Sequence, residues 1–368
     1  MNWRLIAIPA SIVPFIILFV TTKVSPQDVF AVGLVPFIIS SCAALTRIML
    51  QALRFRYFIR MFIGRHVSTT AKTITARLAG EFVTSTTPSY VGGEFIRIAW
   101  LAKQGVPTGK AAWITTMEII ADVFVGSMLA FIAGAFAIYR GGTVIGITVI
   151  LVTIPTFSIW LAFVLLSARR TLQLPAFVLN IMLKLLAKEK AERLFNSANV
   201  AIADLCKMSR ENFNSSRAVK AFAVGLAITF MAFLFQGVSF MVLANAVPSG
   251  SRVGLFDSLM ATSASSAVAS LPITIGGSGL AELGIWAYIS NLNGVFDISK
   301  VIKSAQLSVI IAWRIATYHV PLVVSWLALM RLTAGKASVG GNGLSGKEQG
   351  HGKSEPATKN SPDGNKGV

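Results

Sequence analysis

Six apolar stretches dominate this sequence and limit what it can fold into. A helix that crosses the hydrocarbon core of a bilayer needs about 20 consecutive, mostly apolar residues. The stretches that meet this requirement are residues 5–22, 29–49, 111–138, 143–167, 221–246 and 306–330. The first is interpreted as an uncleaved span rather than a secretory signal, because no small-residue cleavage site follows it. The sequence therefore predicts an all-α integral membrane protein with six full spans.

The composition agrees with a membrane protein. Of the 368 residues, 54% are hydrophobic and 13% are charged, whereas a soluble domain carries about 25% charged residues. The net charge of +18 would suggest nucleic-acid binding in a soluble protein. In a membrane protein it is explained by basic cytoplasmic loops and by attraction to anionic lipid headgroups. We therefore expect membrane lipids, and no nucleic acid, as partners.

The basic residues are concentrated in three segments, which predict the orientation. Residues 47–77 hold seven Lys and Arg with no acid, residues 169–220 hold ten with four acids, and residues 331–368 hold six with three acids. The segments 23–28, 139–142 and 247–256 hold one basic residue each. Because cytoplasmic loops are enriched in Lys and Arg, we expect both termini in the cytoplasm and the chain in the plasma membrane.

The spans group into two halves joined by a linker. We expect a membrane domain over 1–332, with a first repeat at about 29–138, a second at about 221–330, and a cytoplasmic linker over 168–220. The linker contains an apolar helical face and so predicts either an amphipathic helix on the inner leaflet or a solvated helical loop. Residues 333–368 are rich in Gly, Ser, Lys and Asn, a composition that predicts a disordered, basic cytoplasmic tail.

Two further apolar stretches, 74–101 and 257–292, are interrupted by proline and glycine. The first reads Pro88-Ser-Tyr-Val-Gly92-Gly93-Glu94 and continues to Arg97, and the second reads Pro272-Ile-Thr-Ile-Gly276-Gly277-Ser-Gly279-Leu-Ala-Glu282. Proline ends a helix, and paired glycines allow sharp turns and the close approach of a ligand. The loop charges predict that the first element enters from the cytoplasm and the second from the outer face. Each either turns back within the membrane or crosses it fully as two short helices.

Broken segments in corresponding halves of a membrane protein indicate an inverted-repeat transporter with its site near the bilayer midplane. The alternative is that both are ordinary helix–loop–helix turns at the membrane interface. Irregular backbone at membrane depth is tolerated only where it is buried in protein or lines a wet cavity. The pair of motifs therefore favours a polar passage between the two broken elements.

Charged residues within the apolar stretches support the same hypothesis. Glu118 and Asp122 lie four apart on one helical face, and Arg314 lies in the last span. A charge at the bilayer centre costs about 2.5 kcal/mol or more unless it is paired or faces a cavity. Arginine suits an anionic headgroup, because guanidinium binds phosphate in a bidentate fork. Structural ion pairs between helices are the alternative. The residues expected to line the passage are Pro88, Gly92, Gly93, Glu94, Arg97, Glu118, Asp122, Pro272, Gly276, Gly277, Gly279, Glu282 and Arg314.

The sequence contains no recognisable catalytic constellation. It has no Walker A sequence, no H-E-x-x-H, no G-x-S-x-G and no Asp-rich cluster for Mg²⁺ and a diphosphate. The two cysteines, Cys42 and Cys206, argue against a disulfide framework or a cysteine-rich metal site. We therefore expect no catalytic residue, no metal, no cofactor and no enzyme activity.

At these motifs the sequence resembles the family built on the transmembrane region of lysylphosphatidylglycerol synthase, also called the flippase-like domain family. The resemblance covers roughly residues 5–332. The matching pieces are Thr87-Pro88 through Gly92-Gly93-Glu94 with Arg97, Gly105-Val106-Pro107, Gly109-Lys110-Ala111, the Glu118/Asp122 pair, Pro272 through Gly276-Gly277 with Gly279 and Glu282, and Arg314 with Pro321. The resemblance implies the lipid-translocating part without the soluble synthase domain.

The leading hypothesis is a lipid flippase that moves an anionic phospholipid between leaflets. Relatives linked to polyprenol-phosphate sugars make a lipid-linked sugar the second substrate class. Two alternatives remain open: an integral-membrane glycosyl or lipid transferase, and a non-transporting membrane partner of a soluble enzyme. The sequence also leaves a homo-oligomer open.

Overall fold

The computed structural model describes residues 32–64, 67–87, 92–213, 215–247, 252–271, 273–274, 276–292 and 305–334. Met1–Leu332 form one unit, and the chain from Thr333 forms a second. The helices below belong to the first unit, apart from the last two residues of the final helix. The expected span 5–22, the two prolines Pro88 and Pro272, and most of the expected tail lie outside the described residues.

Every regular element in the described part of the chain is a helix, and five helices are long and apolar enough to cross a membrane. Four of them are α3 (Leu34–Phe62), α6 (Thr108–Tyr139), α7 (Thr143–Arg169) and α10 (Ser216–Ala244). The fifth is built from α14 (Ala305–Arg314), the π-helix η1 (Ile315–His319) and α15 (Val320–Ala334). These five confirm the all-α membrane class and match five of the six expected spans.

The first described span is longer than the sequence suggested. We expected it to end at residue 49 and the basic residues after it to form a cytoplasmic loop, but α3 continues to Phe62. No glycine or proline interrupts the chain until Gly64, whose φ of 122° ends the helix. Gly64 donates its N–H to the carbonyl of Ile59 at 3.2 Å, as at many helix C-termini. Arg54 therefore lies inside the bundle.

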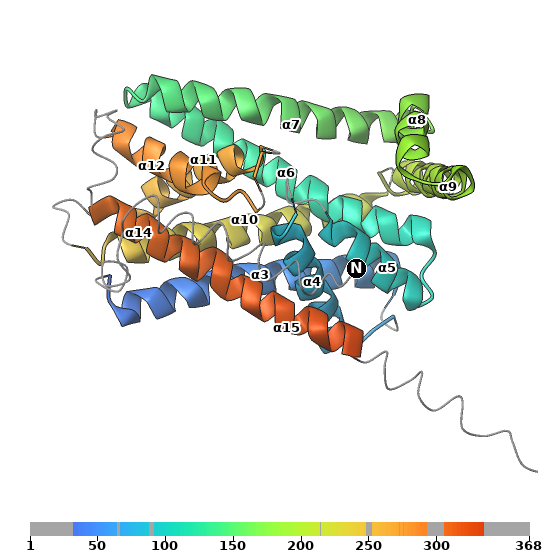
Figure 1. Cartoon of the computed structure of the whole chain (residues 1–368), viewed down its shortest axis with the longest axis horizontal. Helices are drawn as coiled ribbons and strands as arrows, with labels where there is room; N and C mark the ends of the chain where they lie inside the picture. Colours follow the sequence, from blue (N-terminus) through green and yellow to red (C-terminus); the bar gives the residue numbers. More distant parts are fainter. Residues whose placement is uncertain are drawn as a thin grey trace, which may run out of the picture. The chain divides into compact units, whose positions relative to one another are not determined.

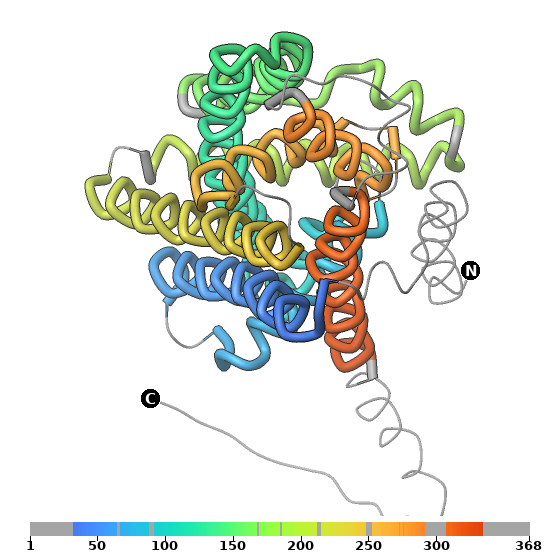
Figure 2. Tube along the Cα trace, turned by 90° about the vertical axis from the view of Figure 1, so that its left-hand side faces the viewer, coloured from blue at the N-terminus to red at the C-terminus, as the bar shows by residue number. Residues whose placement is uncertain are grey.

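Close helix crossings depend on small residues. Figure 2 shows α3 and α10 side by side, and Gly225 on α10 leaves room for the ring of Phe58 on α3. Where α6 crosses α7, a Cβ added at Gly146 would lie 2.6 Å from the carbonyl oxygen of Gly134. Small residues let membrane helices approach closely enough for backbone packing.

Each broken stretch forms a helical hairpin. The first consists of α4 (Thr70–Ser85) and α5 (Gly93–Lys103), and the second of α11 (Leu255–Ala269) and α12 (Leu280–Leu292). The 11 residues of α5 rise only about 16 Å, roughly half of the hydrocarbon core. This length favours hairpins that turn back over helices that cross fully.

The two hairpins enter the bundle from opposite ends. In Figure 1, α4 and α5 lie toward the end that carries α8 (Ala176–Leu185) and α9 (Lys188–Phe213), whereas α11 and α12 lie toward the end where α6 turns into α7. Buried contacts agree, because Leu101 of α5 shares a cluster with Leu205 of α9. Ile285 of α12 instead shares a cluster with Ala137 near the end of α6.

The linker between the halves forms two helices, one of which packs on the protein. Gly109 at the start of α6 lies against Asp204 of α9, where a Cβ would collide with the aspartate. Ala191, Leu205 and Cys206 of α9 are buried. By contrast, Phe177 and Ile181 of α8 are exposed.

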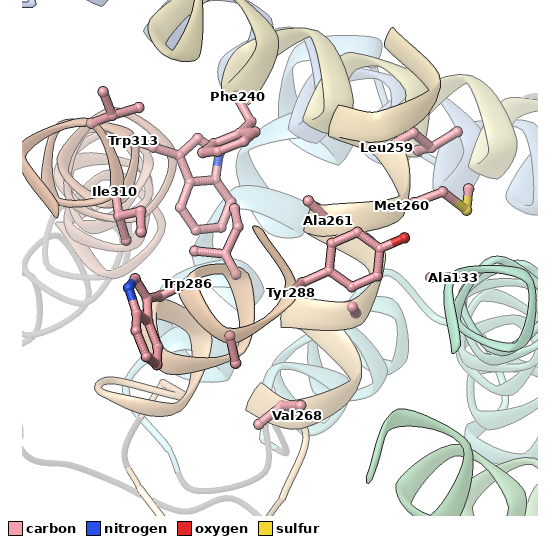
Figure 3. Close-up of a cluster of buried hydrophobic side chains, with 14 of the residues drawn as sticks. Ala133, Phe240, Leu259, Met260, Ala261, Val268, Trp286, Tyr288, Ile310 and Trp313 are labelled. Atoms are coloured by element: carbon pink, nitrogen blue, oxygen red, sulfur yellow. The ribbon is translucent and has the colours of Figure 1, made fainter. Parts of the chain in front are cut away.

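The largest buried cluster surrounds the second hairpin and fixes the last span against it. Figure 3 shows Tyr288 and Trp286 of α12 beside side chains of α6, α11 and α14. Trp313 of α14 packs edge-on against Phe240 of α10 and donates its indole N–H to Ser239 at 3.2 Å. Because Trp313 is held in this way, the next residue, Arg314, projects from a fixed position.

Candidate functional site

In the described part of the chain, the ion pairs inside the bundle form two groups. The larger group, called here the ionic cluster, joins α3, α4, α5 and α6 and consists of Arg54, Arg77, Glu81, Glu94, Arg97, Glu118 and Asp122. The smaller group is the ion pair between Arg314 and Glu282, which joins the last span to the second hairpin.

Glu118 lies at the centre of the ionic cluster. Its side chain is 1% exposed, and three guanidinium groups surround it, with nitrogen–oxygen distances of 3.5 Å to Arg54, 3.6 Å to Arg77 and 3.5 Å to Arg97. Neither carboxylate oxygen has a hydrogen-bond partner in the described part of the chain. The Glu118 carboxylate thus interacts electrostatically with three arginines, at distances longer than those of charge-assisted hydrogen bonds.

Each of these arginines also has a closer partner. Arg54 binds both oxygens of Asp122, at 2.7 and 2.8 Å, and donates to the hydroxyl of Thr229. Arg77 donates to Glu81 at 2.7 Å, and its partner on α3 is Gln51 at 3.1 Å. These contacts explain how charges can persist inside the bundle, since a buried charge must be paired and hydrogen-bonded.

The two motifs that look alike in sequence also have the same local geometry. Glu94 lies in the first turn of α5 and accepts a hydrogen bond from the N–H of Gly92 at 2.7 Å. Glu282 lies in the first turn of α12 and accepts one from Gly279 at 2.8 Å. A carboxylate at a helix N-terminus satisfies an otherwise unpaired N–H and favourably opposes the helix dipole.

Each of these glutamates is also paired with an arginine. Glu94 contacts Arg97 at 3.2 Å, and Glu282 contacts Arg314 at 3.0 Å. The turns before them require glycine, since Gly92 has a φ of 137° and Gly276 a φ of 58°. Both places therefore combine a glycine turn with a capping glutamate and an arginine partner. The arginine lies on the same helix in the first hairpin and on the last span for the second.

The two hairpin tips meet beside the last span. The N–H of Gly276 faces the carbonyl oxygen of Thr87 at 3.5 Å. Arg314 donates to the carbonyl of Gly276, and the hydroxyl of Tyr318 donates to the carbonyl of Ser85 at 2.7 Å. We call these five residues the tip contact. Its most distant members in the sequence, Ser85 and Tyr318, lie 233 positions apart.

The structure brings the expected residues together in two groups. Glu94, Arg97, Glu118 and Asp122 belong to the ionic cluster, and the turn at Gly276–Gly277 lies beside the Glu282–Arg314 pair. Sequence reasoning missed other members. Arg54 and Arg77 were assigned to a cytoplasmic segment, and Tyr318 was not singled out. For Arg54, the missed signal was its place in an apolar helical pattern without a helix breaker.

Five helices long and apolar enough to cross a membrane, two glycine-broken hairpins and internal ionic groups are the features of a multi-pass helical membrane protein. Residues 6–325 match the family model described as the lysylphosphatidylglycerol synthase TM region. The chain therefore belongs to this family. The comparison with curated proteins finds no match.

Proposed function

We propose that this protein is a lipid flippase of the plasma membrane. It moves an anionic phospholipid, or a lipid-linked sugar, between leaflets. The headgroup passes between the two hairpins while the acyl or prenyl chains stay in the bilayer. Both termini lie in the cytoplasm, so the first hairpin opens from the inner leaflet and the second from the outer leaflet.

The observation that carries this proposal is the exposure of Asp122. Asp122 lies about 21 Å from one end of α6 and about 25 Å from the other, and therefore near the middle of the bilayer. Its side chain is nevertheless 34% exposed while it is paired with Arg54. A carboxylate in contact with lipid tails at this depth is costly. Its exposure favours a water-filled space beside α6, which a headgroup needs.

The arginines supply the chemistry for an anionic headgroup. Arg97 is shared between Glu94 and Glu118, with contacts of 3.2 and 3.5 Å. A phosphate that approaches Arg97 replaces one of two carboxylate partners, and the other partner remains. Because guanidinium binds phosphate through two parallel N–H bonds, a phosphate can replace the hydrogen bond between Arg97 and Glu94 while the ion pair with Glu118 remains. Shared arginines therefore favour a transient headgroup site.

Family membership supports the same conclusion, since this family is a membrane domain that is often flippase-like. No contact among the described residues favours the transferase or the enzyme-partner hypothesis over transport. If neither lipid is exchanged in the test below, these two hypotheses take the place of the flippase proposal.

The test is leaflet exchange in proteoliposomes that contain the purified full chain. Fluorescent phosphatidylglycerol and a fluorescent polyprenyl-phosphate sugar are supplied in separate experiments, and the outer-leaflet label is quenched with dithionite. Wild-type protein is expected to expose one of the two lipids faster than empty vesicles do. Exchange of neither lipid, by protein that elutes as a single folded species, contradicts the proposal.

Variants then connect exchange to the site. Arg97→Lys keeps the charge but loses the planar fork. The loss of a charge-assisted hydrogen bond, about 1.5–3 kcal/mol, predicts exchange that is at least about ten-fold slower. Glu192→Gln, which removes an exposed carboxylate on α9, is the matched control and should exchange at the wild-type rate. Equal rates for Arg97→Lys and wild type would remove Arg97 from the passage.

A further inference from the structure

Tyr318 contacts the first hairpin through its hydroxyl group, and it reaches the second hairpin both by lying against Gly276 and through Arg314. Its hydroxyl donates to the carbonyl of Ser85 at 2.7 Å, just before the tip of the first hairpin. Its ring lies under the guanidinium of Arg314, whose central carbon is 4.1 Å from the ring centroid. Arg314 in turn holds the second hairpin through Gly276 and Glu282. The two side chains therefore tie both tips to the last span.

This junction lies near the middle of the bilayer. Tyr318 is about 16 Å from the start of the crossing helix Leu307–Thr333 and about 22 Å from its end. At this depth the two hairpins, which enter from opposite ends, reach each other. A headgroup that passes from one hairpin to the other must therefore cross the tip contact.

The contacts of the junction differ in strength. The backbone bond between Gly276 and Thr87 is 3.5 Å long, beyond the usual range for N–H···O hydrogen bonds. The bond from Tyr318 to Ser85 has the 2.7 Å length typical of O–H···O bonds. The Tyr318 ring also packs with Phe82 of α4 and Leu322 of α15. Tyr318 thus makes the better direct contact with the first tip.

The local backbone can release this junction. Residues Ile315–His319 form a π-helix between two α-helical segments. Such one-turn π segments are rare and occur often at functional sites. Conversion of this turn to α-helix shifts the register by one residue, which rotates the following side chains by about 100°. Because Tyr318 lies inside this turn, the same change of register would carry its side chain away from Ser85 without unfolding the span.

We propose that Tyr318 is a latch that holds the two hairpin tips together and closes the passage at mid-bilayer. Its release, with the change of register in the π-helix, separates Ser85 from Gly276 and lets a headgroup pass between the tips. The proposal rests on the transport function proposed above, but its structural part, the closing of the tips, is tested without transport.

The test uses a cysteine reporter at the tip. Thr86 lies between Ser85 and Thr87 and is buried. Thr86→Cys is introduced into the full chain together with Cys42→Ser and Cys206→Ala, which remove the two native thiols. The rate of reaction with a charged, water-soluble methanethiosulfonate reagent is measured in nanodiscs. This rate reports how often the tips open to water.

Tyr318→Phe removes only the hydroxyl group. The loss of the neutral hydrogen bond to Ser85 is expected to raise the open population, and with it the labelling rate, about five-fold. Tyr288→Phe is the matched control, because Tyr288 is also buried and its hydroxyl has no hydrogen-bond partner in the described part of the chain. It should label at the parent rate. A Tyr318→Phe protein that labels at the parent rate overturns the latch.

A second variant covers the case in which Tyr318→Phe does not fold. A Cβ at Gly276 would overlap both the Tyr318 hydroxyl and the Ser85 carbonyl oxygen. Gly276→Ala should therefore push the tips apart and raise labelling in the same direction. Labelling at the parent rate would equally overturn the latch.

Leaflet exchange separates this inference from the proposed function. Faster labelling together with faster exchange in Tyr318→Phe supports both. If Tyr318→Phe is labelled faster but the wild-type protein moves neither lipid, the closing of the tips by Tyr318 is supported and the flippase proposal is contradicted. If the wild-type protein exchanges lipid but Tyr318→Phe is labelled at the parent rate, the flippase proposal stands and the latch is overturned.

Discussion

Glu118 is the residue on which the first group of buried charges depends. Its carboxylate faces Arg54, Arg77 and Arg97, which come from three different helices. Removal of one partner from a buried ionic group costs more than the pair contributes, because the remaining charges stay desolvated. At this position the loss is multiplied, since three arginines would then face one another without a central negative charge.

Glu118→Gln is therefore expected to destabilise the protein strongly. The amide keeps the shape of the side chain but not the charge, and we expect a loss of about 3–5 kcal/mol in the free energy of unfolding. Intrinsic tryptophan fluorescence during thermal unfolding in detergent measures the change. Glu192→Gln, with its exposed carboxylate on α9, should change stability by less than about 0.5 kcal/mol. Equal unfolding midpoints for the two variants would show that the arginines do not need Glu118.

At the scale of elements, the hairpin α4–α5 is defined by one close contact. Gly93 opens α5 and lies against Gly80 of α4, where a Cβ would overlap the Gly80 carbonyl oxygen and the hydroxyl of Thr84. The conformation of Gly93 itself does not require glycine, since its φ is not in the left-handed region. Its role is steric, and it sets the separation of the two helices.

Gly93→Ala should push α5 away from α4. We expect it to cost about 1–3 kcal/mol, as overpacking usually does, and to slow leaflet exchange, because Arg97 lies one turn further along the same helix. The unfolding midpoint and the exchange rate measure the two effects. Gly254→Ala before α11 is the control, since a Cβ there makes only an ordinary contact of 3.5 Å with Asp257. Wild-type behaviour of both variants would mean that the hairpin tolerates a wider separation.

At the scale of the whole molecule, the sequence predicted what depends on local patterns. Apolar length located five described spans, and proline and glycine located both hairpins. The capping glutamates were found because their motif repeats. Tertiary contacts were not predictable in this way: Arg54 and Asp122 lie 68 positions apart, and Ser85 and Tyr318 lie 233 apart. Arg54 was wrongly assigned to a cytoplasmic segment, because a charged residue in a sequence is normally taken to mark the end of a membrane span. The sequence does not show that a distant carboxylate, Asp122, pairs with this arginine inside the bundle.

The opposite entry of the two hairpins gives a prediction for the whole molecule. Lys and Arg are concentrated at the α4–α5 end of the bundle, so this end is expected in the cytoplasm. In a chain without native thiols, Gln104→Cys, between α5 and α6, should react with a membrane-impermeant maleimide only after cells are permeabilised. Thr143→Cys and Arg252→Cys, at the other end, should react in intact cells; all three positions are exposed. If Gln104→Cys reacted in intact cells and the other two variants reacted only after permeabilisation, the protein would have the inverted orientation. The two hairpins would still enter from opposite faces of the membrane. If all three cysteines reacted from the same side of the membrane, the hairpins could not enter from opposite faces. The proposed passage, which is closed where the two hairpin tips meet, would then be contradicted as well.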